Sequence, residues 1–267
     1  MSAAALSAAG TPGGTPALRT EGLAISFGGF QAVSGMNLEL APGARQALIG
    51  PNGAGKTTLI NLLTGVLRPS QGAIWMGDAN ITGYSCDRRA RLGLSRTFQI
   101  NTLFPNLTPL HSVALAICER DGLAAAFWRP LKSCTAVFDE AHALLARLRL
   151  DSLAHVPVGE MAYGKQRLLE IALALAARPR ILLLDEPAAG VPAGESGELF
   201  DVIAELPREI SVLFIEHDMN LVFRFAQRIS VLVAGRILTE GTPAEIGADP
   251  RVREVYLGHG RAARAHA

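Results

Sequence analysis

The hydrophobic pattern divides the chain into short apolar runs and longer stretches with helical spacing. Apolar runs of strand length occur at 23–27 (LAISF), 36–40 (MNLEL) and 44–50 (ARQALIG). The third run enters a glycine-rich loop, and 57–67 (TTLINLLTGVL) follows with apolar residues three or four positions apart. Strand, loop and helix in this order predict one half of an α/β core.

The pattern changes between about residues 106 and 159. Strand-like runs fade there, and 143–150 (ALLARLRL) places three leucines on one helical face. Strand patterns return at 181–187 (ILLLDEP) and 211–218 (SVLFIEHD), both of the kind that is buried on two faces of a parallel sheet. We therefore expect a helical subdomain inserted into an α/β core.

The two ends of the chain differ from this core. Residues 1–17 consist mainly of Ala, Gly, Thr, Pro and Ser, with almost nothing to bury, which predicts a disordered tail. Near the C-terminus, Asp249 as N-cap, Pro250 as first helical residue and Gly258 as stop predict a short capped helix.

Composition indicates a globular protein without a surface for polyanions. Hydrophobic residues make up 49% of the chain, charged residues only 18%, and the formal net charge is +1, which favours a protein partner over nucleic acid. No apolar run approaches the roughly 20 residues that span a bilayer, and the start lacks the features of a secretory signal, so we expect a cytosolic chain. The cysteines lack metal-ligand spacing and are expected to be reduced structural thiols: Cys86, Cys118 and Cys134.

The strongest chemical pattern is GPNGAGKTT at 50–58, which matches G-x-x-x-x-G-K-[ST] between a strand and a helix. Its three glycines let successive backbone N–H groups curl around the β-phosphate of a nucleotide, and Lys56 reaches the β and γ oxygens. The Thr57 hydroxyl is expected to ligate Mg²⁺, and Thr58 can add a phosphate contact. The candidate loop consists of Gly50, Pro51, Asn52, Gly53, Ala54, Gly55, Lys56, Thr57 and Thr58.

Acidic residues at the end of 181–187 supply the second part of such a site. Asp185 and Glu186 follow a buried strand, at the edge where α/β sheets place their ligands. Asp185 can hold Mg²⁺ through a water molecule, and Glu186 is placed to polarise the water that attacks the γ-phosphoryl group. His217 reaches the same edge, where it can contact the γ-phosphate and orient Glu186. The alternatives are a helix-capping acid before Pro187 and a structural histidine.

These motifs occur in the order of ATP-binding-cassette (ABC) ATPase domains, which the chain resembles over roughly residues 18–260. The resemblance implies an α/β fold: a P-loop NTPase (ABC ATPase) core with an N-terminal antiparallel β subdomain. It also implies that the helical subdomain is inserted at about residues 100–165, and it leaves 261–267 as a C-terminal tail.

The same resemblance assigns further residues. Gln99, in RTFQ at 96–99, matches the glutamine that senses Mg²⁺ and γ-phosphate at the hinge to the helical subdomain. Phe27 matches the aromatic residue that stacks on adenine, with a core phenylalanine as the alternative. Residues 188–191 resemble the family's loop after the catalytic glutamate.

MAYGK at 161–165 opens a helix and corresponds to the family's glycine motif, which faces the nucleotide of a second cassette. The sequence departs from the common L-S-G-G-Q: Ala162 replaces the serine that usually touches the γ-phosphate, Tyr163 replaces the first glycine and Lys165 replaces the glutamine. Gly164 is expected to leave the backbone open to close approach, and Lys165 can add positive charge. We therefore expect ATP contact across a dimer to be retained with altered contributions.

Several short segments resemble the ATP-binding subunits of branched-chain amino-acid importers. They are AYG before a helix beginning Q-R, DEPAAG, IEHDM and DPRVREVYLG. The resemblance implies an ATP-hydrolysing, Mg²⁺-dependent energy-coupling subunit on the cytoplasmic face of the membrane. Its partners would be a second ABC ATPase chain, identical or paralogous, transmembrane permease subunits and, indirectly, a solute-binding protein, but no nucleic acid. Two alternatives remain: the ATPase of a related amide or urea importer, and a soluble ABC ATPase acting on nucleic acid or ribosomes. The latter would be expected to bring tandem cassettes, a coiled-coil arm or a basic patch, and the sequence has none of these.

Overall fold

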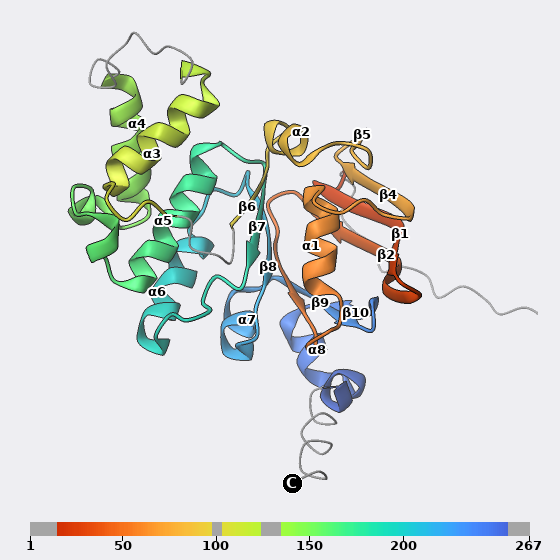
Figure 1. The fold of residues 1–267 in the computed structure, drawn as a ribbon. Helices are drawn as coiled ribbons and strands as arrows, with labels where there is room; N and C mark the ends of the chain where they lie inside the picture. Colours follow the sequence, from red (N-terminus) through yellow and green to blue (C-terminus); the bar gives the residue numbers. More distant parts are fainter. Residues whose placement is uncertain (1–14, 98–102, 124–134, 256–267) are drawn as a thin grey trace, which may run out of the picture.

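The computed structural model describes residues 15–97, 103–123 and 135–255, which form a β subdomain, a central α/β core and a helical region (Figure 1). Nearly all of the predicted N-terminal tail, the predicted C-terminal tail, Gln99 and Cys134 lie outside these ranges. At the end of the predicted N-terminal tail, the Ala17 N–H already bonds to the Leu40 carbonyl oxygen at 2.8 Å.

The β subdomain is a four-stranded sheet in the order β2-β1-β4-β5. Its strands are β1 (Leu18–Phe27), β2 (Phe30–Leu40), β4 (Gln71–Met76) and β5 (Ala79–Asn80). Neighbouring strands in this sheet are antiparallel, which agrees with the antiparallel β subdomain that the resemblance implies. Gly28 and Gly29 both have positive φ, 52° and 90°, and form the tight turn between β1 and β2.

The core contains a six-stranded sheet in the order β10-β9-β3-β8-β7-β6. The strands are β3 (Arg45–Ile49), β6 (Leu94–Arg96), β7 (Ile181–Asp185), β8 (Ser211–Ile215), β9 (Arg228–Val233) and β10 (Arg236–Gly241). All neighbours are parallel except β9 and β10. The central strands β3, β7 and β8 are buried along their whole length, although β3 begins with the polar residues Arg45 and Gln46 and β8 with Ser211.

Helices cover both faces of this sheet (Figure 1). The helices of the described residues include α1 (Lys56–Thr64), α2 (Cys86–Arg91), α3 (Pro109–Arg120), α4 (Thr135–Arg147), α5 (Tyr163–Ala176), α6 (Ala193–Ala204), α7 (Met219–Phe225) and α8 (Pro243–Ala248), and α4 packs on α3 and α5 away from the sheet. Short 3₁₀ turns at Asp151–Leu153 and Val158–Glu160 connect α4 to α5. The region between β6 and α5 is thus helical where it is described, as the sequence pattern predicts.

Two helix ends show how local sequence sets the boundaries. The helix predicted over 57–67 ends earlier, because Gly65 adopts a left-handed conformation with φ 82° and closes α1 through a bond to the Leu62 carbonyl. Asp249 caps the helix at residues 250–255, as predicted, and its carboxylate accepts a bond from the Arg251 N–H at 2.9 Å. The predicted stop at Gly258 lies outside the described residues.

Successive side chains of the buried strands face opposite sides of the sheet, and this divides the interior into two apolar clusters. In β7, Leu182 and Leu184 join the cluster that includes α3, α4, α5 and α6, whereas Ile181 and Leu183 join the one that includes α1 and the antiparallel sheet. A parallel strand with both faces covered needs apolar residues at every position. This requirement explains the run ILLL, and the described helices of the insertion pack on one side of the sheet.

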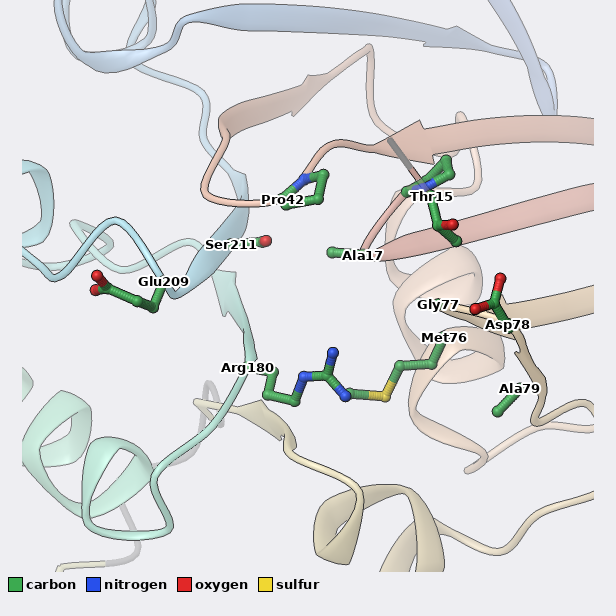
Figure 2. A pocket seen from close by; sticks show the side chains of 11 residues that line it. Thr15, Ala17, Pro42, Met76, Gly77, Asp78, Ala79, Arg180, Glu209 and Ser211 are labelled. Atoms are coloured by element: carbon green, nitrogen blue, oxygen red, sulfur yellow. The ribbon is translucent and has the colours of Figure 1, made fainter. Parts of the chain in front are cut away.

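A cavity of about 390 Å³ lies between the β subdomain and the core, as Figure 2 shows. Arg180 and Ser211 line it, and these residues mark the amino ends of β7 and β8. The cavity is therefore at the opposite end of the strands from Asp185 and His217. It does not belong to the site that the sequence predicts.

Buried Arg89 joins α1 to the loop before α2. The residue is 1% exposed, and its guanidinium donates to the Leu62 and Leu63 carbonyls at 2.6 and 2.7 Å. It also donates to the Tyr84 and Thr82 carbonyls at 3.1 and 2.9 Å. The last carbonyls of a helix lack intrahelical partners and carry partial negative charge, so a cation there satisfies both requirements.

Arg89→Met should lower the free energy of unfolding by about 2–4 kcal/mol, because it leaves buried carbonyl groups without donors. Urea unfolding followed by circular dichroism measures the change. Arg91→Met is the matched control on the same helix, since its side chain is 79% exposed. The control should change the free energy by less than about 0.5 kcal/mol. Equal effects of the two substitutions would contradict the anchoring role of Arg89.

Candidate functional site

The glycine-rich loop between β3 and α1 depends on close backbone approach at two positions. A side chain at Gly50 would collide with the Leu232 carbonyl oxygen of β9, and a Cβ at Gly55 would lie 2.5 Å from the Ala32 carbonyl oxygen of β2. Gly55 also has φ 103° and is the N-cap of α1, a conformation that L side chains rarely adopt. These contacts hold the loop at the carboxyl end of β3, in front of the positive end of α1.

Lys56 lies inside this loop. Its ammonium donates to the Gly50 and Pro51 carbonyls at 2.7 and 3.0 Å, and the residue is 7% exposed. Burial lowers the pKa of Lys56, while the negative charges of Glu186 and Asp185 raise it. The cation is thus electrostatically coupled to both acidic residues that the sequence places at the same edge.

Asp185 ends β7 as a buried carboxylate paired with a cation. Arg96, in β6, donates to its Oδ2 at 2.7 Å and to the Asn61 amide oxygen at 2.7 Å. The side chain of Asp185 is 1% exposed and that of Arg96 is 12% exposed. The other carboxylate oxygen, Oδ1, is buried and has no hydrogen-bond partner among the described residues. A buried oxygen of this kind fits an additional positive or hydrogen-bonding ligand.

Glu186 and His217 meet as predicted. His217 Nε2 lies 2.5 Å from Glu186 Oε1, and both side chains are partly exposed. Glu186 has φ 49°, a left-handed conformation that is uncommon for a residue with a side chain. Its backbone N–H bonds to the Ile215 carbonyl oxygen at 3.0 Å, which ties the turn after β7 to the end of β8. Strain at such a position persists only where neighbouring contacts hold it.

Glu216 also lies at this edge, although it is not among the residues that the sequence motifs predict for the site. The residue is 5% exposed, and its carboxylate accepts the Ala188 N–H at 2.9 Å and the His217 N–H at 3.0 Å. The available indication was an acidic residue at the end of an otherwise apolar strand, immediately before His217. Arg96 was missed in the same way, because only the glutamine of RTFQ received an assignment.

Four predicted residues occupy the start of α5. Ala162 is the N-cap and offers no side-chain hydrogen bond, Tyr163 begins the helix, and Lys165 pairs with Glu198 of α6 at 2.7 Å. Close approach to Gly164 by the nucleotide of a second chain stays a prediction, but a side chain of the same chain already lies against this glycine. Gly164 is buried, and a Cβ there would collide with a carboxylate oxygen of Glu195 in α6.

The remaining candidate residues differ in their exposure to solvent. Phe27 is 48% exposed at the end of β1, so the alternative of a core phenylalanine is wrong. Thr57 is exposed and Thr58 is half-buried, both in the first turn of α1. Asn52 and Gly53 are exposed at the tip of the loop. Gln99 lies outside the described residues.

Comparison with known proteins decides the family. The family model described as "ABC transporter" matches residues 33–189, more than half of the chain. The chain belongs to the ABC transporter family. A second model, described as "Branched-chain amino acid ATP-binding cassette transporter", matches residues 236–262.

Relatives of this ABC protein include the high-affinity branched-chain amino acid transport ATP-binding proteins LivG of Escherichia coli (strain K12) and BraF of Pseudomonas aeruginosa. Each is 40% identical over 250 residues, covering 91% of this chain and 98% of the relative. A solved ATP-binding cassette of an ABC transporter in its ADP conformation has a TM-score of 0.81 and 32% identity, covering 92% of this chain and all of that one. A nucleotide-free cassette has a TM-score of 0.79 and 30% identity, covering 90% and 98%. The predicted ABC ATPase fold is confirmed.

Among the described residues of this ABC protein, no helix is both long enough and apolar enough to cross a membrane.

The pair of Arg96 and Asp185 gives a test of the site's electrostatics. Arg96→Met and Asp185→Asn should each lower the free energy of unfolding by about 2–4 kcal/mol, because each removes one member of an ion pair whose carboxylate is buried. The double variant should cost about 1–3 kcal/mol less than the sum of the single ones. Urea unfolding of all four proteins measures this coupling.

The exposed pair of Arg91 and Asp87, 3.1 Å apart, serves as the matched control. The same cycle on that pair should give a coupling of less than about 0.5 kcal/mol. Purely additive effects at Arg96 and Asp185 would contradict a stabilising ion pair there.

Proposed function

We propose that this chain is the ATP-hydrolysing, energy-coupling subunit of an importer for branched-chain amino acids. The observation that carries the proposal is the meeting of the glycine-rich loop, Asp185, Glu186 and His217 at the carboxyl edge of one parallel sheet. The proteins LivG and BraF, named for high-affinity branched-chain amino acid transport, support the choice of solute.

ATP is the substrate, and the loop would hold its phosphates. Backbone N–H groups from Gly53 to Thr58 and the positive end of α1 favour the β-phosphate. The Lys56 ammonium, now bonded to two loop carbonyls, would exchange these bonds for β and γ oxygens. Exposed Phe27 offers a surface for adenine, and aromatic stacking on a base contributes about 1–3 kcal/mol.

Mg²⁺ fits the acidic side of this site. The buried Oδ1 of Asp185, which has no hydrogen-bond partner among the described residues, supports a water-mediated contact, and the exposed Thr57 hydroxyl is the natural direct ligand. Gln99 is the third proposed ligand and lies outside the described residues. When bound, Mg²⁺ supplies Lewis-acid polarisation of the β and γ oxygens. Arg96 would keep the carboxylate of Asp185 fixed for this role.

Glu186 would accept the proton of the attacking water, and His217 would hold Glu186 in position. The contact of 2.5 Å between His217 Nε2 and Glu186 Oε1 supports this pairing. The imidazole can also direct a hydrogen bond at the γ-phosphoryl group, where negative charge must be stabilised during transfer. Gln99 would contact that group at the hinge to the helical region, so that the position of this region would depend on the presence of the γ-phosphate.

A second cassette chain would complete the site. The start of α5 carries helix N–H groups, Gly164 and Lys165, and it would face the γ-phosphate of that chain. Because Lys165 pairs with Glu198 in the free chain, forming the interface requires Lys165 to exchange one anionic partner for another. The second chain would be identical or a paralogue, and permease subunits would attach the dimer to the cytoplasmic face of the membrane.

The solute would be chosen outside this chain, by the permease subunits and a solute-binding protein. The same cassette is 34% identical over 239 residues to a ribose import ATP-binding protein of Rhizobium meliloti, of which it covers 46%. Cassettes of one fold thus occur in proteins named for different solutes. The amide and urea importers therefore remain the alternative that an uptake measurement decides.

Glu186→Gln should reduce ATP hydrolysis by at least 100-fold, because it keeps the shape of the side chain but removes the general base. ATP affinity should remain within about threefold of the wild type, since the glycine-rich loop is unchanged. Phosphate release and equilibrium nucleotide binding measure the two quantities. Glu160→Gln, in the exposed turn before α5, is the control and should hydrolyse ATP at the wild-type rate. Wild-type hydrolysis by Glu186→Gln would contradict its assignment as general base.

Deleting the gene in its own host should lower uptake of leucine, isoleucine and valine, because transport needs ATP hydrolysis by this chain. Uptake of the labelled amino acids by whole cells measures the loss. Wild-type protein should restore it, and the Lys56→Ala variant should not. Normal uptake of all three, with loss of amide or urea uptake, would replace the proposed solute by that of the alternative importers.

A further inference from the structure

Glu216 is a buried carboxylate in an unusual position. It follows the last residue of β8 directly and is 5% exposed. No ion pair with a lysine or arginine is found for it in the part of the chain that the structure describes. Burying a carboxylate without a cation is costly, so its partners must compensate through hydrogen bonds.

Backbone N–H groups from two segments provide these bonds. Oε1 accepts the Ala188 N–H at 2.9 Å, and Oε2 accepts the His217 N–H at 3.0 Å. The Asp218 N–H also bonds to the carboxylate. Burial raises the pKa of Glu216, and these three N–H groups oppose that change. The carboxylate therefore bridges the loop after Glu186 and the start of the segment that carries His217.

These contacts close a ring around the proposed general base. Glu186 reaches His217 through its side chain, His217 reaches Glu216 through its backbone, and Glu216 returns to Ala188, two residues after Glu186. Glu186 itself is held at φ 49°, a conformation that the backbone leaves unless it is restrained. The bond between its N–H and the Ile215 carbonyl is one restraint, the bond from the Ala189 N–H to its carbonyl is a second, and the Glu216 bridge adds another.

We propose that Glu216 is a positioning residue, whose carboxylate sets the separation between Glu186 and His217 by bonding to the backbone beside each. The inference rests on the proposed ATPase function. Glu216 does not touch the nucleotide; it acts through Glu186. Losing the bridge would let the loop at residues 188–191 move relative to β8, and the general base would spend less time in line with the attacking water.

Steady-state ATP hydrolysis by Glu216→Gln tests the proposal. The amide keeps the size of the side chain, but its NH₂ group faces an N–H donor, so one of the two bridging bonds is lost. We expect kcat to fall by about 10- to 100-fold, while KM for ATP and equilibrium ATP affinity stay within threefold, because the glycine-rich loop is untouched. Because a smaller folded fraction would also lower the apparent kcat without changing KM, kcat is calculated per ATP-binding site counted by equilibrium binding, and circular dichroism checks the fold of the variant.

Glu170→Gln is the matched control. Glu170 in α5 is also a buried carboxylate whose pKa is raised by burial, but its partner is Arg167 and not the loop after Glu186. The control should hydrolyse ATP with wild-type kcat. If Glu216→Gln does not fold, Glu216→Asp carries the same test, because a carboxylate one methylene shorter cannot reach both N–H groups.

The double variant Glu186→Gln/Glu216→Gln tests whether Glu216 acts through Glu186. We expect its residual rate to equal that of Glu186→Gln within twofold, since the positioning of an absent base has no further effect. The inference would be overturned if the losses of the two single variants multiply in the double variant, or if folded Glu216→Gln keeps the kcat of an active wild type. Either result would leave the proposed ATPase function intact. A wild-type chain that does not hydrolyse ATP would overturn the proposed function, and this inference with it.

Discussion

The close backbone packing at Gly50 and Gly55 is the constraint on which the site depends. Gly50 lies against the Leu232 carbonyl of the core sheet, and Gly55 lies against the Ala32 carbonyl of the antiparallel sheet. The Gly235 N–H bonds to Ala54 at 2.9 Å, so the turn between β9 and β10 supports the loop as well. The loop is thus fixed at the junction of two sheets. Because α1 starts at the end of this loop, the junction also fixes the direction of the helix. Any side chain at these glycines would separate the parts that the site needs together.

Charge at the carboxyl edge is arranged so that each buried group has a specific form of compensation. Asp185 pairs with Arg96, Lys56 bonds to loop carbonyls, and Glu216 accepts backbone N–H groups. These three charged groups differ in how readily they can exchange their hydrogen-bond partners. An ammonium bonded to carbonyl oxygens can exchange them for phosphate oxygens, whereas a carboxylate bridging two backbone segments can move only if the segments move. The edge therefore combines one adaptable cation with a rigid acidic frame.

Motifs that depend on local geometry were predictable from the sequence. The order of strand, glycine-rich loop and helix at 44–67, the buried strands at 181–187 and 211–218, and the meeting of Glu186 with His217 all follow from spacing and from the rule for parallel sheets. Contacts that depend on the fold as a whole were not. No local pattern indicates that Arg96 reaches Asp185, 89 positions further along the chain. Equally, no pattern near Gly164 indicates that Glu195 of the next helix lies against it, because that contact depends on how α5 and α6 pack.

The acidic start of α6 changes how an interface at α5 forms. Glu195 lies against Gly164, and Glu198 holds Lys165, so the end of α5 that would receive an incoming phosphate already has carboxylates of the same chain beside it. These carboxylates are tethered a few ångströms away and compete at a high effective concentration. In the proposed dimer, docking a nucleotide there would be an exchange of anions, and its free energy would be a difference between two attractions. Such a site would favour ligands with more negative charges over weakly charged ones.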